Sequence, residues 1–392
     1  MSHQLIERSP DLKRLREEGY NIEIKSNYLV INEVPYVNSN KEIGVGILAA
    51  NLTLAGDITT TPNHVAYFAG SHPCHADGTE ILHIKHSSSP ETIDEHLTTN
   101  HSFSNQPQEG YKDYYAMMTT YIAIITGPAQ TIDSKVTAKT FPVIIAPEGE
   151  DSVFKYRDTA TSRAGIGTVS KKLELNKIAI VGVGGTGSYV LDLVAKTPVR
   201  EIHIFDGDVF LQHNAFRSPG APSCEELEEI PKKTAYFEKI YSSMRTGIVT
   251  HDYAIDSSSV DELAEMSFVF ICMDGSKTKQ LIVEKLEEHG IPFVDTGIGV
   301  QMVNEMLHGV LRTTTSTVSK REHVRKGRVS FSDDDGDNEY SRNIQIAELN
   351  ALNASLAVIK WKKLFGFYKD YENEHSSMYT TDGNHMTNED TL

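Results

Sequence analysis

The chain has few of the features that mark secreted or membrane proteins. Its three cysteines, Cys74, Cys224 and Cys272, stand far apart among 392 residues and form no CxxC pair, so we expect no disulfide framework and a reducing compartment. No apolar run is as long as a membrane span, and the polar start MSHQLIERSPDLKRLREEG lacks the apolar core of a signal peptide. We therefore expect a cytoplasmic protein that does not associate with membranes.

The chain also lacks an excess of positive charge. Lys and Arg number 37 against 54 Asp and Glu, which gives a formal net charge of -17. This charge disfavours non-specific binding to nucleic acid or to anionic lipid. Hydrophobic residues make up 39% and charged residues 23%, as in ordinary globular proteins, and the length is sufficient for two domains.

Residue patterns divide the chain into three parts. Residues 1–150 predict a β-rich α+β domain of unknown role, for which partner docking is one hypothesis. Residues 151–368 alternate strand and helix patterns, which predicts a doubly wound, Rossmann-like α/β domain with its ligand at the carboxyl ends of the strands. Residues 369–392 are polar, acidic and nearly free of aliphatic side chains, so we expect a disordered tail.

The second domain contains a glycine-rich turn between a predicted strand and a predicted helix. The apolar run Ile178–Val181 is typical of a buried parallel strand, and apolar residues at helical spacing follow the turn. The turn contains Gly182, Gly184, Gly185 and Gly187. Such a turn binds nucleotide phosphates on free N–H groups at a helix N-terminus, and Asp206 follows about 20 positions later, where an acid normally binds ribose hydroxyls. A nicotinamide-dependent oxidoreductase would share these features.

The residues after Asp206 favour a different class. The run D-G-D-V-F-L-Q-H-N-A-F-R, Asp206 to Arg217, resembles the D-x-D-x-V-x-x-x-N-x-x-R signature of the ThiF/MoeB superfamily, which includes the activating enzymes of ubiquitin-like proteins. Pro231-Lys232 matches its Pro-Lys, Cys272-Met273-Asp274-Gly275 matches its strand-end motif, and Lys279 lies where the family usually has an arginine. The resemblance spans about residues 162–365 and looks closest to bacterial members with an extra N-terminal domain.

The resemblance implies ATP and Mg²⁺ as cofactors and gives each polar residue a role. Arg217 and Lys232 would place fixed positive charge on the phosphates, and Asn214 would donate to a phosphate oxygen. Asp206 would bind the ribose hydroxyls, and Asp208 would lie near the nucleotide.

Two further roles follow from the resemblance. Asp274 would hold Mg²⁺ against the phosphate oxygens. Family members are commonly homodimers in which an arginine upstream of the glycine turn reaches the partner's ATP. Arg163 is the best candidate by position and Arg157 the second.

Each role has a plainer alternative. Lys232 and its neighbour Lys233 could be solvated residues in the first turn of a helix. Asp274 could cap the following helix, and Asp208 could brace its loop. Arg217 could form a surface salt bridge.

The resemblance implies adenylation of the C-terminal carboxylate of a ubiquitin-like or sulfur-carrier-like protein, with release of pyrophosphate. A tRNA-modifying relative, an oxidoreductase and a binding protein on a catalytically decayed adenylation fold stay open as alternatives. A conjugating-enzyme-like acceptor is a further partner hypothesis. The family's zinc-binding CxxC pairs are absent, so we expect no structural zinc in this domain.

Many such enzymes pass the acyl group to a cysteine in the loop before the last helix. Between Met273 and Leu392 there is no cysteine, which excludes a thioester on that loop. Two hypotheses remain: direct transfer from the adenylate, which we favour slightly, or an oxyester on a loop Ser or Thr activated by a general base. The candidate hydroxyls are Thr313, Thr314, Thr315, Ser316, Thr317, Ser330, Ser332 and Ser341.

The remaining cysteines and histidines favour structural roles. Cys272 lies within an apolar strand and is expected in the core, and Cys224 has acidic neighbours that disfavour a nucleophile. His72, Cys74 and His75, with His64 upstream, form a metal-like cluster in GSHPCHADG, but their spacing is not a standard zinc pattern. We favour a proline-shaped turn there over zinc or catalysis.

Overall fold

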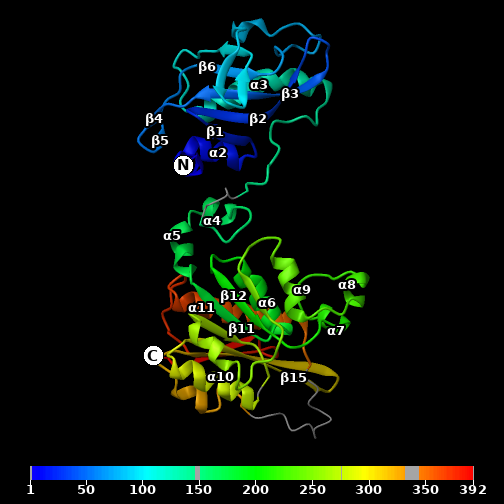
Figure 1. Ribbon diagram of the computed structural model, residues 1–392, viewed down its shortest axis with the longest axis vertical. Helices are drawn as coiled ribbons and strands as arrows, with labels where there is room; N and C mark the ends of the chain where they lie inside the picture. The colour runs from blue at the N-terminus through cyan, green and yellow to red at the C-terminus, as the bar shows by residue number, and fades with distance from the viewer. Residues whose placement is uncertain (1, 146–150, 275, 332–343, 392) are drawn as a thin grey trace. The chain divides into compact units, whose positions relative to one another are not determined.

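The computed structural model describes residues 2–145, 151–274, 276–331 and 344–391. The chain divides into two compact units, Met1–Ile144 and Ile145–Leu392 (Figure 1).

The first unit is built on an antiparallel sheet of order β1-β2-β3-β6-β10-β7. These strands are β1 (Asn21–Lys25), β2 (Tyr28–Val37), β3 (Ile43–Asn51), β6 (Val65–Ala69), β7 (Lys85–Ser87) and β10 (His101–Ser104). Its other elements are α1 (Ser2–Arg8), α2 (Pro10–Glu17), α3 (Tyr114–Ile132), η1 (Leu82–Ile84) and the hairpins β4 (Leu54–Ala55)–β5 (Ile58–Thr59) and β8 (Glu91–Asp94)–β9 (Leu97–Thr99).

Helix α3 forms the main core of this unit with the sheet. Asp113 begins the helix, because its side chain accepts from Ala116 N at 2.8 Å. Met117 and Tyr121 of α3 are fully buried in one cluster with Leu29 and Ile31 of β2. The β-rich α+β class expected for this part of the chain is confirmed.

The second unit contains an eight-stranded sheet of order β13-β12-β11-β14-β15-β16-β17-β18. Its first five strands are parallel, and the last three add antiparallel. The bounds are β11 (Lys177–Val181), β12 (Glu201–Phe205), β13 (Ile248–His251), β14 (Phe268–Ile271), β15 (Phe293–Val303), β16 (Met306–Ser316), β17 (Ser376–Thr380) and β18 (His385–Glu389). The alternation of strands and helices expected from the sequence is confirmed, and β13 is an additional strand that it did not predict.

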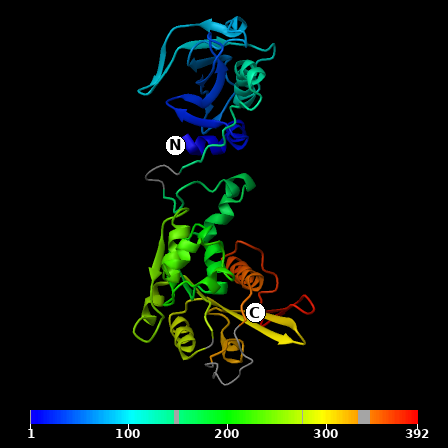
Figure 2. The same ribbon diagram turned by 90° about the vertical axis from the view of Figure 1, so that its right-hand side faces the viewer.

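Helices cover both faces of the parallel part of this sheet. One core joins the sheet to α6 (Gly185–Ala195), α9 (Lys233–Tyr241) and α11 (Ala347–Leu364), and the other joins it to α10 (Lys277–Glu288) and η3 (Val260–Glu265). Short helices complete the unit: α4 (Thr159–Ala164), α5 (Gly167–Ser170), α7 (Gln212–Ala215), α8 (Cys224–Glu228), η2 (Lys171–Leu173) and η4 (Glu322–Arg325). Figure 2 shows the long β15–β16 hairpin in yellow. This is the doubly wound α/β architecture expected from the sequence.

The expectation of a disordered tail over residues 369–392 is wrong for most of that segment. Strands β17 and β18 extend the sheet, with Arg312 of β16 opposite Met378 and Met378 opposite Thr387. A polar sequence can form such strands because backbone N–H and C=O groups supply the ladder. Two acidic side chains before β17, Asp370 and Glu374, are paired with lysines of α11.

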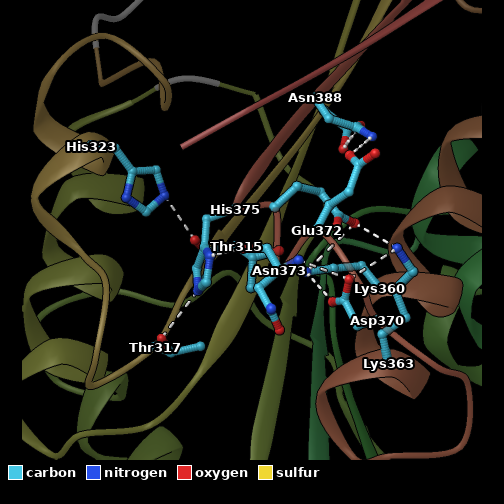
Figure 3. Close-up of polar contacts among 12 residues, drawn as sticks. Thr315, Thr317, His323, Lys360, Lys363, Asp370, Glu372, Asn373, His375 and Asn388 are labelled. Carbon is cyan, nitrogen blue, oxygen red and sulfur yellow. Dashed lines mark hydrogen bonds and ion pairs between the residues drawn. The ribbon is translucent and has the colours of Figure 1, made fainter. Parts of the chain in front are cut away.

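The pairing begins directly after α11 (Figure 3). Lys360, a buried residue of α11, donates to Asp370 at 2.9 Å, and Lys363 donates to Glu374 at 2.9 Å. The Lys360 bond opposes the effect of burial and brings the pKa of Asp370 to about 2. Buried His375 also lies within hydrogen-bond distance of Thr317, 3.3 Å from its Oγ1. These contacts attach the segment to the domain.

Two further expectations concern the acidic stretch before α11 and membrane-spanning helices. The acidic stretch SDDDGDNEY (332–340), which contains Ser332, lies outside the described residues, as does Ser341. In the described part of the chain, every helix is too short or too polar to cross a bilayer.

The ion cluster provides a test of the C-terminal attachment. Asp370→Asn should lower the free energy of unfolding by about 2 kcal/mol at neutral pH, because buried Lys360 loses its nearer carboxylate. Urea titration would measure this loss. Asp382→Asn, a change at an exposed turn between β17 and β18, is the control; equal stability of the two variants would contradict the attachment.

Candidate nucleotide-binding site

The glycine turn joins β11 to α6, and at two of its glycines a side chain would not fit. Gly182 has φ +86°, and a Cβ there would lie 2.6 Å from the carbonyl oxygen of Cys272 at the end of the neighbouring strand β14. A Cβ on Gly187 would clash with the carbonyl of Gly182, whereas one on Gly184 would meet nothing within 4 Å. The turn is therefore tight on the protein side and open at Gly184, where a phosphate could approach.

Asp206 connects the end of β12 to this turn. Its Oδ2 accepts from Val183 N and its Oδ1 accepts from Asp208 N, both at 2.9 Å. The residue is only 9% exposed. Asp206 thus fixes the glycine turn and its own loop, in addition to any contact with a ribose.

Lys233 is the buried counter-ion of this carboxylate pair. Its Nζ lies 2.7 Å from Asp208 Oδ2 and 3.5 Å from Asp206 Oδ1. Its hydrogen bond is the main cause that lowers the pKa of Asp208, and the charges of Lys232 and Arg217 act in the same direction. The alternative that Lys233 is a solvated residue is wrong, and one basic cluster surrounds Asp208.

The other predicted phosphate ligands lie around the same loop. Lys232 is the N-cap residue of α9, and its Nζ donates to the carbonyl of Gly207. Asn214 is buried, and its Oδ1 accepts from Leu211 N at 2.8 Å, which leaves the amide nitrogen as its donor. Arg217 is half-buried, and in the described residues its Nε has no hydrogen-bond partner.

Asp274 follows β14 in the loop that leads to α10. The cap of α10 is Ser276, whose side chain accepts from Lys279 N at 3.1 Å. Asp274 is therefore not the helix cap, and its side chain is exposed. Mg²⁺ commonly binds one or two carboxylates together with substrate phosphates, so one exposed aspartate beside the glycine turn fits the ion.

The arginines upstream of the turn lie in a separate short segment. Arg163 is exposed on α4, which Asp158 caps by accepting from Thr161 N at 2.9 Å. Arg157 is half-buried just before this helix. The role of Arg163 toward a second subunit stays a prediction.

The three cysteines and the histidine cluster are not among these ligands. Cys272 follows β14 and is half-buried, packed against the core rather than within it as expected, and burial raises the pKa of its thiol to about 12. Cys224 is exposed at the start of α8. Cys74 donates to the carbonyl of His72 at 3.3 Å, a contact within the turn around Pro73. Among the described residues, no group of three or more His, Cys, Asp or Glu is arranged to hold a metal.

Two asparagines of α11 contribute contacts that the sequence analysis missed. Asn350 accepts from Thr186 Oγ1 at 3.0 Å and donates to the carbonyl of Arg217 at 3.2 Å. Asn353, one turn later, donates to the carbonyl of Gly297 at 3.1 Å. Both are fully buried. The sequence carried a signal for these contacts, because two asparagines at helical spacing interrupt an otherwise apolar face of the helix.

These elements define a Rossmann-like α/β domain. The chain belongs to the ThiF family, whose model matches residues 157–391. Residues 10–159 match a second model, described as a domain of unknown function, DUF6791. The ThiF match includes β17 and β18, which the sequence analysis had left outside the domain.

Curated relatives and solved structures resemble this chain at low identity. Ubiquitin-like modifier-activating enzyme 5 of Culex quinquefasciatus is 22% identical over 181 residues, which are 43% of this chain and 46% of that protein. The protein of the same name from Aedes aegypti is 22% identical over 41% of this chain and 43% of its own length. The chain thus spans less than half of these relatives.

Among solved structures, E. coli MccB with MccA-N7isoASN is 17% identical, with a TM-score of 0.47, over 60% of this chain and 73% of that one. SeMet PaaA is 15% identical, with a TM-score of 0.44, over 57% of this chain and 76% of that one.

The two adjacent lysines should differ in their effect on stability. Lys233→Met should lower the melting temperature clearly, because two carboxylates, one of them buried, lose their shared counter-ion. Lys232→Met should change it little, since among the described residues its ammonium group bonds to the half-buried carbonyl of Gly207 and to no carboxylate. Calorimetry of both variants measures the difference, and equal melting temperatures would contradict the role assigned to Lys233.

Proposed function

We propose that the second unit is an ATP-dependent adenylyltransferase that activates a carboxylate. The observation that carries this proposal is the basic cluster of Arg217, Lys232 and Lys233 beside an open glycine turn. A nicotinamide enzyme has to bind its pyrophosphate, whereas an adenylyltransferase has to stabilise pyrophosphate as it leaves. The excess of fixed positive charge suits the second task.

The reaction needs one bond made and one broken at the α-phosphorus. A carboxylate oxygen of the substrate attacks the α-phosphorus, the bond to the bridging oxygen breaks, and pyrophosphate leaves with that electron pair. Arg217 and Lys232 would stabilise the charge on the phosphate oxygens, and Asn214 would donate a neutral hydrogen bond. Asp206 and Asp208 would position the nucleotide's ribose end. Mg²⁺, held by Asp274, would supply further charge neutralisation at these oxygens.

We infer that the carboxylate is the C-terminus of a ubiquitin-like or sulfur-carrier-like protein. The support is the family membership together with the modifier-activating enzymes among the relatives. A conjugating-enzyme-like protein is the corresponding acceptor. Because residues 273–392 contain no cysteine, the acyl group would pass directly from the adenylate or through a Ser or Thr oxyester. A decayed binding protein is less compatible with the intact basic cluster.

Nucleotide binding separates adenylation from nicotinamide chemistry. Isothermal titration should show ATP binding that strengthens with Mg²⁺, and no measurable NAD binding. Asp274→Asn should remove most of the Mg²⁺ dependence without unfolding the protein, because the ion loses its protein ligand. Asp261→Asn, at an exposed carboxylate of η3, is the control. NAD binding without ATP binding would overturn the proposal.

Arg163 gives a test of a shared site in a homodimer. We expect Arg163→Gln and Arg217→Gln to weaken ATP binding separately. After subunit exchange, the two variants together should regain one intact site in each mixed dimer, since each intact site takes Arg217 from one chain and Arg163 from the other. Titration with ATP measures the recovered sites. A monomer in solution, or no recovery after verified exchange, would contradict the shared site.

A further inference from the structure

A second buried charged cluster lies on the α10 side of the sheet, next to the proposed site. Lys279 of α10 is 2% exposed, and its Nζ donates to Asp295 Oδ1 at 2.7 Å. Arg312 of β16 places its Nη2 3.7 Å from Asp295 Oδ2, which is close enough for an ion pair but too far for a hydrogen bond. Asp295 is completely buried.

This cluster is incomplete in two respects. Asp295 Oδ2 and Arg312 Nε are buried and have no hydrogen-bond partner among the described residues. The two basic side chains also outnumber the one carboxylate, which leaves an excess of positive charge in a region largely removed from water. Buried charge of this kind is costly unless an anion balances it.

The cluster lies at the reactive end of the sheet. Asp295 pairs with Ile271, the last residue of β14, and Asp274 follows three residues after Ile271. The glycine turn contacts the same strand end, since a Cβ on Gly182 would meet the carbonyl of Cys272. An anion beside Arg312 would therefore lie on the strand edge that the proposed Mg²⁺ ligand also occupies.

The backbone of β15 next to Arg312 is open at Gly299. Asp295, Gly297 and Gly299 alternate onto one face of β15, and Arg312 lies opposite Gly297. The three atoms nearest to a Cβ on Gly297 all belong to the guanidinium of Arg312, and a Cβ on Gly299 would meet nothing within 4 Å. The guanidinium group of Arg312 lies across this strip, which has no side chains of its own, and the side chain of Arg312 is 25% exposed.

We propose that Arg312 binds the C-terminal carboxylate of the substrate chain, with Asp295 and Lys279 as the residues that position it. The open space over Gly299, next to the guanidinium, would accommodate the extended end of that chain. Arg suits this role because its planar guanidinium donates two parallel hydrogen bonds to a carboxylate. The inference rests on the proposed adenylation, and it specifies a free C-terminal carboxylate as the group that is recognised.

The test uses the whole protein and two small probes, N-acetylglycylglycine and its C-terminal amide. Binding is titrated with and without Mg²⁺ and an ATP analogue whose α–β bridge is a methylene group. The acid should bind at least about tenfold more tightly than the amide. Arg312→Gln should weaken binding of the acid by about tenfold or more and leave binding of the nucleotide analogue unchanged. Arg312→Lys should restore part of the affinity for the acid.

Arg325→Gln, which removes a half-exposed arginine of η4 paired with Glu287, is the control and should bind both probes as the wild type does. Arg312→Gln keeps the buried bond between Lys279 and Asp295, so it should fold. Equal binding of acid and amide, undiminished acid binding by Arg312→Gln, no acid binding by the wild type, or an equal loss of nucleotide binding would overturn the inference. Failure of the wild type to bind the nucleotide would instead count against the proposed adenylation, since acid binding is also measured without nucleotide.

Discussion

The bonds made by Asp206 hold the candidate site together. This carboxylate ends β12, receives N–H bonds from Val183 and Asp208, and faces the buried ammonium group of Lys233. Three segments therefore meet at one side chain: the glycine turn, the loop after β12 and the start of α9. A carboxylate with two backbone donors and a nearby cation is a stable buried arrangement, because its charge is well solvated by the protein. The open face at Gly184 and the basic side chains around Asp208 depend on this junction.

Helix α11 supports the site from the other side. Asn350 joins it to Thr186 of α6 and to the backbone of Arg217, and Asn353 joins it to Gly297 of β15. A buried amide left without partners is costly, so these bonds restrict how α11 can pack. The helix thus relates the glycine turn to the strip beside Arg312, and the nucleotide and the carboxylate would be held by one rigid arrangement of elements.

Much of the fold could be predicted because its signals are local. The apolar run Ile178–Val181 followed by glycines predicted β11 and α6, and the later alternation of patterns predicted the doubly wound sheet. The C-terminal strands could not be predicted in this way. Their ladder bonds are made by backbone groups, their side chains are polar, and the charges that attach them pair with Lys360 and Lys363 of α11. Composition alone resembles that of a disordered segment.

The sequence by itself determined the strand–glycine–helix unit, the positions of Asp206, Asn214, Arg217 and Asp274, and the resemblance to the ThiF family, because these depend on short spacings along the chain. Only the tertiary structure decided that Lys233 is buried against two carboxylates and that Ser276, not Asp274, caps α10. It also brought together Lys279, Asp295 and Arg312, which lie on a helix and two strands. Such contacts depend on how the elements pack, since charge pairing and burial are properties of neighbours in space rather than in sequence.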